Sequence, residues 1–299
     1  MQPLVQRLGH VALNVSNLER SVRDAIEVAG VAVVEKTATR ALLTSNQRHA
    51  ELVMHQAAKD EIRSVGFETL SAEAVDAVAE RVREAGLRIL SEKPSLPTIE
   101  RALTFASSEG HVFEVHSPMA LDRPLRHIGP GIHPRCIDHV NLSASDPETL
   151  VRELSRTTGL LLSERTTGHE LSWLRAGDGR HHTVGVVKGA TGIHHYSWEF
   201  ADFADFKRLG DILETLDRQI VWGPGRHGCG DNLFAYYLDA GGFMVECTAE
   251  MEIISDPNFQ PRIVEPGENL SNYKVVNRWG ALPSELWLGH HTGFAAQAA

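Results

Sequence analysis

An internal repeat restricts the fold of this sequence more than any other feature. Residues 8–39 and residues 137–168 follow the same order: an apolar strand containing His-Val-x-Leu, a capped amphipathic helix, a glycine stop, and a strand rich in Val or Leu. Self-similarity of this kind indicates that one structural unit occurs more than once. The chain is therefore predicted to consist of two similar halves.

Each half divides into two smaller units that read strand, helix, strand, strand, strand. Polar residues that cap helices and glycines that end them set the helix limits. In the first unit these are Ser16 or Asn17 and Gly30, and in the second they are Ser71 and Gly86. The same signals recur in the second half, so we expect four copies of a βαβββ module.

Changes in composition divide the chain into four segments. We expect residues 1–120 to form the first half, residues 121–134, rich in Pro, Gly and His, to form a linker, and residues 135–250 to form the second half. Residues 251–299 have little periodicity, and their tryptophans suggest a strap on the body of the protein or a lid. Residues 293–299 are expected to be loose, as chain ends often are.

The composition is that of an ordinary globular protein, since 42% of the residues are hydrophobic and 23% are charged. A formal net charge of −10 argues against nucleic acid or an anionic membrane surface as a partner. No apolar run is long enough to span a bilayer, and the first residues have no signal-peptide core. The three cysteines are too few for a disulfide framework. These features favour a cytoplasmic protein.

The stretch from Gly223 to Glu246 carries the strongest chemical signal. It begins as a Gly/Pro-rich loop with His227, continues as an apolar strand with Tyr236, turns, and enters a second apolar strand with Glu246. A carboxylate in such an apolar run is costly to bury unless a positive group meets it. A metal ion is one such group. His139 and the pair His194-His195 also lie in apolar strands, and they supply the matching ligand type.

Comparison of the halves predicts that only the second carries a complete site. His139 corresponds to His10 and Glu246 to Glu114, but the strand of His195 corresponds roughly to V-G-F-E-T-L, which has no histidine. Counting back from the glutamate, the partner of Tyr236 is Thr104 and that of His227 is Ser95. We expect the first half to be a structural copy whose site has decayed.

The motifs of the second half resemble those of the type I extradiol ring-cleaving dioxygenases of the vicinal oxygen chelate superfamily. Their order and spacing are most similar to the catechol 2,3-dioxygenase and homoprotocatechuate 2,3-dioxygenase branches. The matching motifs are I-D-H-V-N with His139 and Asn141, R-H-H-T-V-G-V with His182, G-I-H-H-Y-S-W with His195, G-P-G-R-H-G with His227, and Tyr236 followed by V-E-C with Glu246.

This resemblance implies an α+β fold: four βαβββ modules in two similar halves, each half a mixed-sheet partial barrel with helices outside. It implies Fe(II), or Mn(II), bound by His139, His195 and Glu246, because two histidines and a carboxylate leave positions open for a catechol and O2. It further implies a homo-oligomer in aromatic catabolism that gives a ring-opened muconic semialdehyde-type product.

The resemblance also assigns roles around the metal. His182 would take and return a substrate proton, as a group with a pKa near neutrality can. His227 and Tyr236 would hydrogen-bond the substrate oxygens. Successive strand side chains point to opposite faces, so only one member of each histidine pair can face the metal. The resemblance implies that it is the second member, His182 or His195. The residues expected to border the substrate are Asn141, Trp173, His181, Trp222 and Arg278.

Two of these residues bear on the catechol's substituent. Trp222 stands where homoprotocatechuate enzymes carry an arginine that anchors a carboxylate, so an apolar or aromatic substituent is favoured. Arg278 would supply a charge if the tail folded over the site. Cys229 could line the pocket, whereas the pair His290-His291 in the tail is expected to be solvated.

Two other functions compete with the dioxygenase. A glyoxalase-like isomerase or lyase of the same superfamily would use four protein ligands and no oxygen. A binding protein of bleomycin-resistance type would lack the ligand set. Three further polar residues near a three-ligand site, His182, His227 and Tyr236, favour the dioxygenase over both alternatives.

Overall fold

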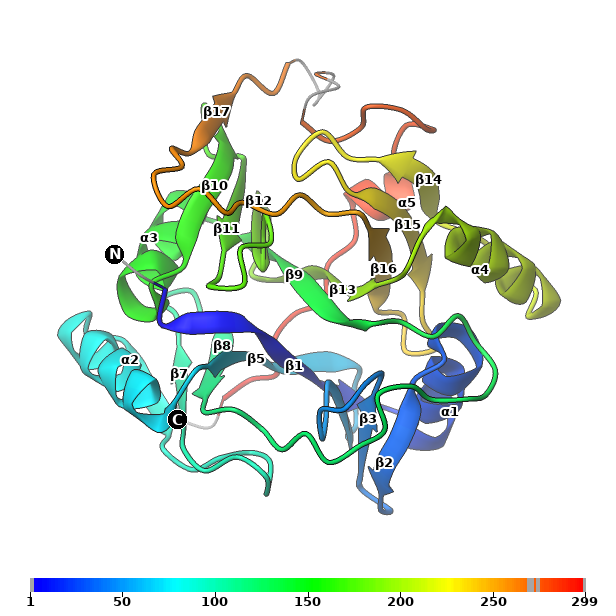
Figure 1. Ribbon diagram of the computed structural model, residues 1–299, viewed down its shortest axis with the longest axis horizontal. Helices are drawn as coiled ribbons and strands as arrows, with labels where there is room; N and C mark the ends of the chain where they lie inside the picture. Colours follow the sequence, from blue (N-terminus) through cyan, green and yellow to red (C-terminus); the bar gives the residue numbers. More distant parts are fainter. Residues whose placement is uncertain (1–2, 268–271, 273–274, 298–299) are drawn as a thin grey trace.

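The computed structural model describes residues 3–267, 272 and 275–297, and it arranges them in two mixed β-sheets with helices outside (Figure 1). Among the described residues the first sheet has the strand order β2-β3-β4-β1-β5-β8-β7-β6. The second has the order β14-β15-β16-β13-β9-β12-β11-β10-β17. Each half therefore contains two four-stranded modules, and the predicted α+β fold with four βαβββ modules is confirmed.

The first sheet and its helices are built from residues before the linker. Their bounds are β1 Val5–Val15, α1 Leu18–Asp24, the π-helical turn Ala25–Ala29, β2 Ala32–Lys36, β3 Arg40–Thr44, β4 Leu52–Gln56, β5 Glu61–Thr69, α2 Ala72–Glu84, β6 Arg88–Ser91, β7 Ala102–Ala106 and β8 Val112–His116.

The second sheet and its helices follow the linker. Their bounds are β9 Cys136–Ala144, α3 Pro147–Thr158, β10 Leu161–Thr166, β11 Leu171–Arg175, β12 Val184–Lys188, β13 Gly192–Glu199, α4 Phe203–Thr215, β14 Trp222–Arg226, β15 Leu233–Leu238, β16 Met244–Ala249, β17 Arg262–Val264 and α5 Glu285–Leu288.

The helix starts follow the capping signals of the sequence. The Asn17 side chain accepts a hydrogen bond from the Arg20 amide, and Ser71 caps α2 in the same way. Each of these bonds satisfies one of the amides that the first turn of a helix leaves unpaired. Gly30 ends the first helical segment at a φ of 82°, where glycine is favoured. The π-helical turn before Gly30 is a feature that the sequence pattern did not predict.

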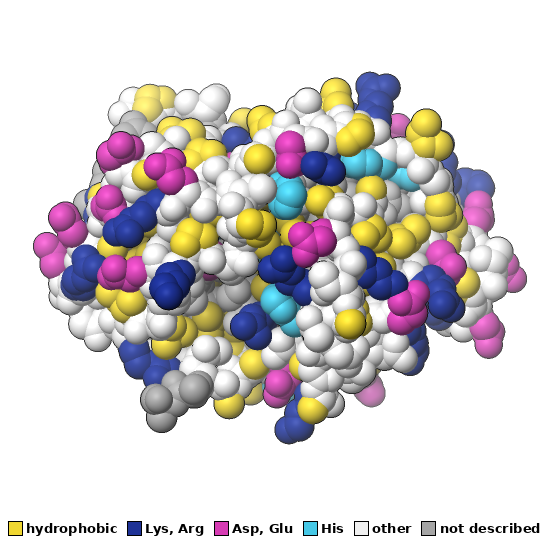
Figure 2. Space-filling model, turned by 90° about the horizontal axis from the view of Figure 1, so that it is seen from below, with side chains coloured by type: hydrophobic (Ala, Val, Ile, Leu, Met, Phe, Trp, Pro, Cys, Tyr) yellow, Lys and Arg dark blue, Asp and Glu magenta, His cyan; other side chains and the backbone are white. Residues whose placement is uncertain are grey.

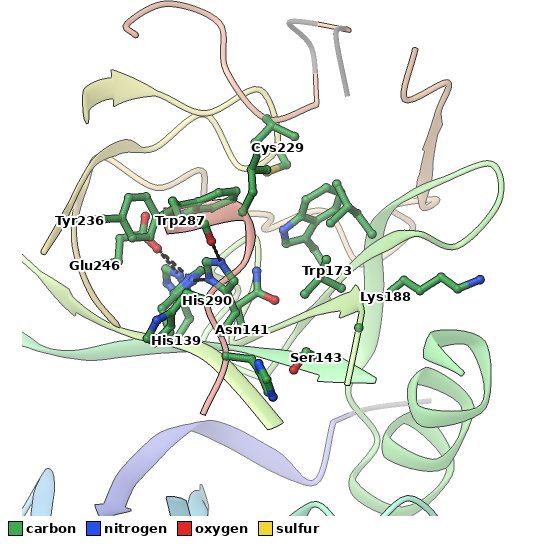
Figure 3. A pocket seen from close by; sticks show the side chains of 18 of the residues that line it. His139, Asn141, Ser143, Trp173, Lys188, Cys229, Tyr236, Glu246, Trp287 and His290 are labelled. Carbon is green, nitrogen blue, oxygen red and sulfur yellow. Dashed lines mark hydrogen bonds and ion pairs between the residues drawn. The ribbon is translucent and has the colours of Figure 1, made fainter. Parts of the chain in front are cut away.

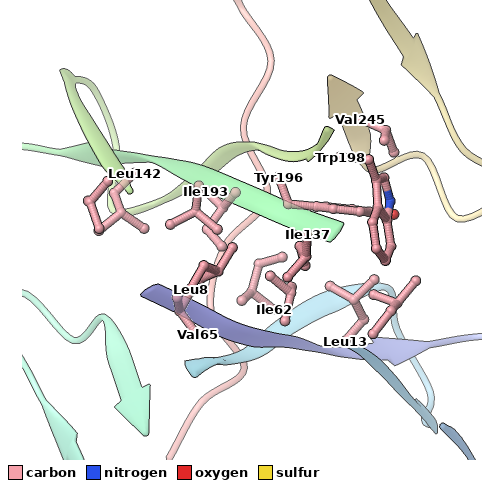
Figure 4. Packing of buried hydrophobic residues seen from close by; sticks show 14 of the residues in the cluster. Leu8, Leu13, Ile62, Val65, Ile137, Leu142, Ile193, Tyr196, Trp198 and Val245 are labelled. Carbon is pink, nitrogen blue, oxygen red and sulfur yellow. The ribbon is translucent and has the colours of Figure 1, made fainter. Parts of the chain in front are cut away.

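The core lies between the two sheets, where β1 and β5 face β9 and β13 (Figure 4). Apolar side chains from both halves meet there, among them Leu8, Leu13, Ile137, Ile193 and Trp198, all nearly inaccessible to solvent. Burial of apolar area stabilises a fold by roughly 25 cal/mol per Å². Because one core joins both halves, the strands that carry the candidate site residues, β9, β13 and β16, pack against the first half.

The first part of the segment predicted as a Gly/Pro-rich loop is instead an edge strand, whereas residues 227–232 lie between strands as predicted. Trp222–Arg226 forms β14, and its only sheet neighbour among the described strands is β15. Pro224 lacks a backbone N–H, and such a residue is tolerated at a sheet edge, where one side of the strand needs no partner. The prediction was wrong because edge position cannot be read from local composition.

The end of the chain is not loose as far as the structure describes it. The Ile62 amide donates to the Gly293 carbonyl at 2.9 Å, and the Ala295 amide donates to the Ile62 carbonyl at 2.8 Å. Phe294 packs against the main core. The tail therefore reaches across to the first half and hydrogen-bonds the start of β5, while Ala298 and Ala299 lie outside the described residues.

Charges of both signs cover the surface. Figure 2 shows basic and acidic side chains interspersed on the face seen from below Figure 1, with hydrophobic side chains between them. Within the described residues, no helix combines the length and apolar character that crossing a membrane requires.

Candidate functional site

Three neighbouring strands of the second sheet bring together His139, His195 and Glu246. His139 lies on β9, His195 on the adjacent strand β13, and Glu246 on β16, which pairs with β13 on its other side. The His139 and His195 Nε2 atoms lie 2.9 Å and 3.0 Å from Oε2 of Glu246. All three residues are buried. The sheet thus converges three ligand atoms from distant parts of the sequence.

The spacing of these atoms fits a metal ion. The three residues each offer a ligand atom, and these atoms lie within 4.8 Å of one another. Ligands bound about 2.1 Å from one ion at right angles to each other are about 3 Å apart, which matches the two nitrogen–oxygen distances. Two neutral imidazoles and one carboxylate are also the donor set of mononuclear non-haem iron sites. The residues present therefore fit a divalent ion.

Electrostatics in the cluster keep its carboxylate ionised. Burial alone raises the pKa of Glu246, but His139, His195 and His227 outweigh it and hold that pKa well below its ordinary value. Burial lowers the pKa of His139, whereas Glu246 and Asp138 raise it to about 9. The Asp138 carboxylate lies 2.6 Å from Nδ1 of His139, so this nitrogen donates to Asp138 and Nε2 is directed at Glu246.

His227, in the loop after β14, and Tyr236, on β15, lie beside the Glu246 carboxylate. The Tyr236 hydroxyl lies 2.9 Å from His227 Nε2, and that nitrogen lies 3.5 Å from Oε1 of Glu246. His227 Nδ1 contacts the Val276 carbonyl, which can only accept, so Nδ1 carries a proton. Burial and Glu246 raise the pKa of Tyr236 well above its ordinary value, which keeps the hydroxyl protonated.

The pair His181 and His182 divides between a buried contact and the cluster. The rings of His182 and His139 are 4.4 Å apart, and His182 Nδ1 lies 3.0 Å from Nδ1 of His181. His181 turns its Nε2 toward the Glu164 carboxylate, 3.3 Å away. Burial, followed by the nearby His139, lowers the pKa of His182 well below its usual range, so the side chain is neutral.

A pocket of about 340 Å³ opens above these residues (Figure 3). In the view, Tyr236 and Glu246 lie on one side, and Trp173 and Lys188 lie on the other. The lining includes the predicted residues His139, Asn141, Trp173, His182, His195, Cys229, His227, Tyr236 and Glu246. The Oδ1 atom of Asn141 is buried without a hydrogen-bond partner among the described residues, which suits a ligand group in the pocket.

Three residues predicted to border the substrate do not line this pocket. His181 is buried behind His182. Trp222 is buried behind Tyr236, stacked on it at 5.4 Å, and its Nε1 donates to the Ala281 carbonyl. Arg278 lies near the surface and pairs with Asp231 at 3.2 Å. Each lies outside the lining and makes these contacts instead, which the motif spacing does not reveal.

The tail, expected to form a strap or a lid, supplies wall residues that the sequence did not single out. Trp287, Leu288, His290 and His291 all line the pocket, so the expectation that the His290-His291 pair is merely solvated is corrected. His290 is half-buried and His291 is exposed. The only available signal was the Trp-Leu-Gly-His-His run itself, since tail packing over a site depends on contacts far apart in the sequence.

Comparisons with known proteins place the chain among proteins of similar sequence and fold. Residues 7–115 match the model described as "Glyoxalase/Bleomycin resistance protein/Dioxygenase superfamily". The manganese-dependent 2,3-dihydroxybiphenyl 1,2-dioxygenase of Geobacillus genomosp. 3 is 26% identical over 280 residues, which cover 86% of this chain and 89% of that protein.

Two solved structures share the fold over nearly the full length. The Mn(II)-bound glyoxalase from Novosphingobium aromaticivorans has a TM-score of 0.85 at 23% identity, covering 98% of this chain and 96% of its own. Homoprotocatechuate 2,3-dioxygenase from Brevibacterium fuscum, in complex with 3,4-dihydroxyphenylacetate, has a TM-score of 0.88 at 19% identity, covering 97% and 93%. The chain thus matches the Glyoxalase/Bleomycin resistance protein/Dioxygenase superfamily model over residues 7–115, and it shares the fold of these two structures over nearly its full length.

Proposed function

We propose that this protein is an extradiol dioxygenase, which opens the ring of a catechol-type substrate beside its two hydroxyl groups with both atoms of O2. The product would be a ring-opened muconic semialdehyde or a related ketone. One observation carries the proposal: the His139, His195 and Glu246 ligand atoms meet at the floor of a pocket that His182, His227 and Tyr236 also line. The similarity to a 2,3-dihydroxybiphenyl dioxygenase supports it.

His139, His195 and Glu246 would hold one Fe(II) or Mn(II) ion. When bound, the ion supplies binding positions for the catechol oxygens and O2 and a path for electrons between them. Sequence resemblance favours Fe(II), whereas one relative is named manganese-dependent and one structure of the same fold is Mn(II)-bound. We therefore propose Fe(II) as the ion and Mn(II) as the alternative.

The polar residues on the open side manage protons. His182 is neutral, and its Nδ1 is engaged by His181, so Nε2 is left to accept a proton from a substrate hydroxyl and later return it. Tyr236 stays protonated and donates its hydroxyl hydrogen to His227 or to a substrate oxygen. A fixed donor of this kind stabilises negative charge that develops on oxygen.

The pocket walls orient the ring and exclude water. Leu171, Trp173, Val187, Val276 and Trp287 give the upper pocket an apolar surface. Aromatic and aliphatic walls bury a flat ring and hold it in one position. Trp222, which stands at the position of the family's arginine, and Arg278 of the tail both lie outside the lining. An apolar or aromatic substituent on the catechol therefore stays favoured over an acidic one.

The test is oxygen consumption with a panel of catechols. Metal-free protein is loaded anaerobically with Fe(II) or with Mn(II), and air is then admitted while absorbance of the yellow ring-fission product is followed. We expect O2 uptake and product in equal amounts, with both lost in His195→Ala and Glu246→Ala. Metal-loaded protein that consumes no O2 with any catechol would overturn the proposal.

The Mn(II)-bound glyoxalase of the same fold favours a second candidate, a metal-dependent isomerase or lyase. Such an enzyme needs no O2, so turnover of a non-catechol substrate under anaerobic conditions would identify it. The homo-oligomer and the cytoplasmic location stay predictions from the sequence.

A further inference from the structure

His194, which lies next to the candidate ligand His195, contacts both that ligand and the tail. Its Nδ1 lies 2.8 Å from Nδ1 of His195, and its Nε2 lies 2.7 Å from the Trp287 carbonyl oxygen. Successive side chains of a regular strand point to opposite faces, which would keep the two rings apart. The pairing of β13 with β9 shifts register between Ile193 and His195, and such a bulge redirects side chains.

The positions of the protons follow from what each atom can accept. The Trp287 carbonyl has no hydrogen to give, so Nε2 of His194 must donate. A neutral imidazole has one donor and one acceptor, which makes Nδ1 of His194 the acceptor. His194 is buried, and burial disfavours a second proton on its ring. His195 must then donate from Nδ1, and its Nε2 lone pair is left facing Glu246.

The other histidine pair also has a contact between its two Nδ1 atoms. His181 Nε2 faces the Glu164 carboxylate, and its Nδ1 meets Nδ1 of His182. Glu164 is held in turn by Arg262 of β17 at 3.1 Å. In both pairs the two Nδ1 atoms meet, but only His194 forms a hydrogen bond through its Nε2, since His181 Nε2 lies near Glu164 without a hydrogen-bond partner among the described residues. The tail takes part in both, through the Trp287 carbonyl and through Arg262.

We propose that His194 is a positioning residue: it fixes the proton of His195 on Nδ1, keeps Nε2 free to bind the metal ion, and makes metal affinity depend on the Trp287 carbonyl of the tail. This inference rests on the proposed metal site. Partners that orient a ligating histidine in this way raise metal affinity, and their removal typically weakens it about 10–100-fold.

The experiment is a Mn(II) titration of metal-free, full-length protein, with free Mn(II) measured by its electron paramagnetic resonance signal. His194→Phe keeps a ring against Trp287 but removes both hydrogen bonds. We expect its dissociation constant to rise about 10–100-fold. His194→Asn places an amide oxygen near the Nδ1 position, where it accepts from His195, so we expect it to recover at least half of the loss on a logarithmic scale.

Trp287→Phe is the matched control, because it changes the side chain and keeps the carbonyl. Its dissociation constant should stay within about twofold of the wild type, since the hydrogen bond to His194 remains. Thermal unfolding of the metal-free variants checks that each is folded, and His194→Asn serves if His194→Phe is not.

The outcomes separate this inference from the proposed function. Wild-type protein that binds no Mn(II) and no Fe(II) would remove the metal site itself. Wild-type binding with unchanged affinity in His194→Phe would overturn the positioning role alone. Equal weakening in Trp287→Phe would also overturn it, because ring packing rather than the carbonyl bond would then control affinity, and failure of His194→Asn to recover affinity would do the same.

Discussion

The two halves share a fold and differ in whether it brings together three residues that could hold a metal ion. His10 and Glu114 stand in the first half where His139 and Glu246 stand in the second, and both pairs are buried. The nitrogen–oxygen distance is 3.5 Å in the first half and 2.9 Å in the second. A buried histidine and glutamate on two strands of the same sheet, with one strand between them, are therefore not sufficient for the proposed metal centre.

The missing groups explain the difference. Thr104 pairs with Glu114 in the sheet as Tyr236 pairs with Glu246, which agrees with the correspondence predicted from the sequence. The amide of Ser95 donates to Glu114 at 3.0 Å, at the position from which His227 approaches its glutamate. The first half thus satisfies its carboxylate with a backbone amide, whereas the second surrounds it with three histidines.

The sheet register corrects one alignment between the halves. Glu114 pairs with Gly66 on β5, and Glu246 pairs with Ser197 on β13. Counting back two residues from each places Ser64 at the position of His195, whereas the motif alignment placed Phe67 there. The sequence alignment was out of register because the segments around Phe67 and His195 share only their apolar character.

Space differs as much as chemistry. A Cβ atom added at Gly66 would lie 2.3 Å from the His10 ring, and one added at Gly9 would lie 2.1 Å from Nε2 of His116. Imidazole rings therefore pack directly on the backbone in the first half. The second half leaves a pocket of about 340 Å³ at the equivalent place. The comparison shows that the open volume and the third ligand occur together.

The largest expected effect separates the two glutamates. Glu246→Gln should lose more than about 100-fold in metal affinity, because even outer partners of a ligand contribute 10–100-fold. Ring cleavage should fall with it. Glu114→Gln should keep both, since its carboxylate serves only local hydrogen bonds. Mn(II) titration and O2 uptake measure the pair, and equal losses in both variants would refute the assignment.

His182 provides the next largest contrast. The sheet pairings of Val184 with Val140 and of Leu52 with Val11 place Ala50 at the corresponding position of the first half. We expect His182→Asn to lower kcat about 10²–10⁴-fold, the usual size of a general acid–base contribution, with metal affinity changed far less. Steady-state O2 uptake and Mn(II) titration check this, and a loss in affinity alone would make His182 a ligand instead.

Ser64→His tests whether the first half can regain a site. Ser64 is buried, so the added imidazole should overpack the core and destabilise the fold by about 1–3 kcal/mol. Urea denaturation measures that loss. The number of Mn(II) ions bound per chain should not change. A second bound ion would show that the missing ligand alone separates the halves.

The smallest effect concerns the turns after β7 and β15. The Ser107 amide donates to the His111 carbonyl as the Asp239 amide donates to the Phe243 carbonyl, so the two turns correspond. Burial, followed by the nearby Asp24, raises the pKa of Asp239 to about 7. The folded state then binds more protons than the unfolded state between about pH 4 and about pH 7, and stability falls as the pH rises through that window.

Asp239→Asn should remove the part of the pH-dependent loss of stability that comes from Asp239. Oδ1 of residue 239 accepts from the Gly241 and Phe243 amides, and an asparagine can keep both bonds. Urea denaturation at about pH 5 and about pH 8 should show the variant gaining stability relative to wild type at the higher pH. A difference between the two proteins that does not change with pH would contradict a raised pKa at this position.

The architecture could be predicted from the sequence because the signals for helix starts, helix ends and strands are local. The caps at Asn17 and Ser71, the stop at Gly30 and the repeated strand motif each act within a few residues, and they predicted the modules correctly. The π-helical turn and the edge strand β14 were missed, because they depend on packing and on strand order.

The site divides in the same way. The order of the motifs singled out the three residues that the sheet brings together, but it could not tell which residues behind them face the pocket. Trp222 and His181 support the cluster from outside the lining, and Arg278 lies elsewhere. Trp287 and His290 reach the pocket through a tail whose path is fixed only by long-range contacts such as the hydrogen bond from His194.

The most direct test of the account is anomalous diffraction from crystals of the full chain prepared with Mn(II). The account predicts one strong peak per chain, within ligand distance of His139, His195 and Glu246, and none between His10 and Glu114. A peak in the first half, or none at the three predicted ligands in crystals that contain Mn(II), would contradict the central claim that the duplicated fold carries one metal centre.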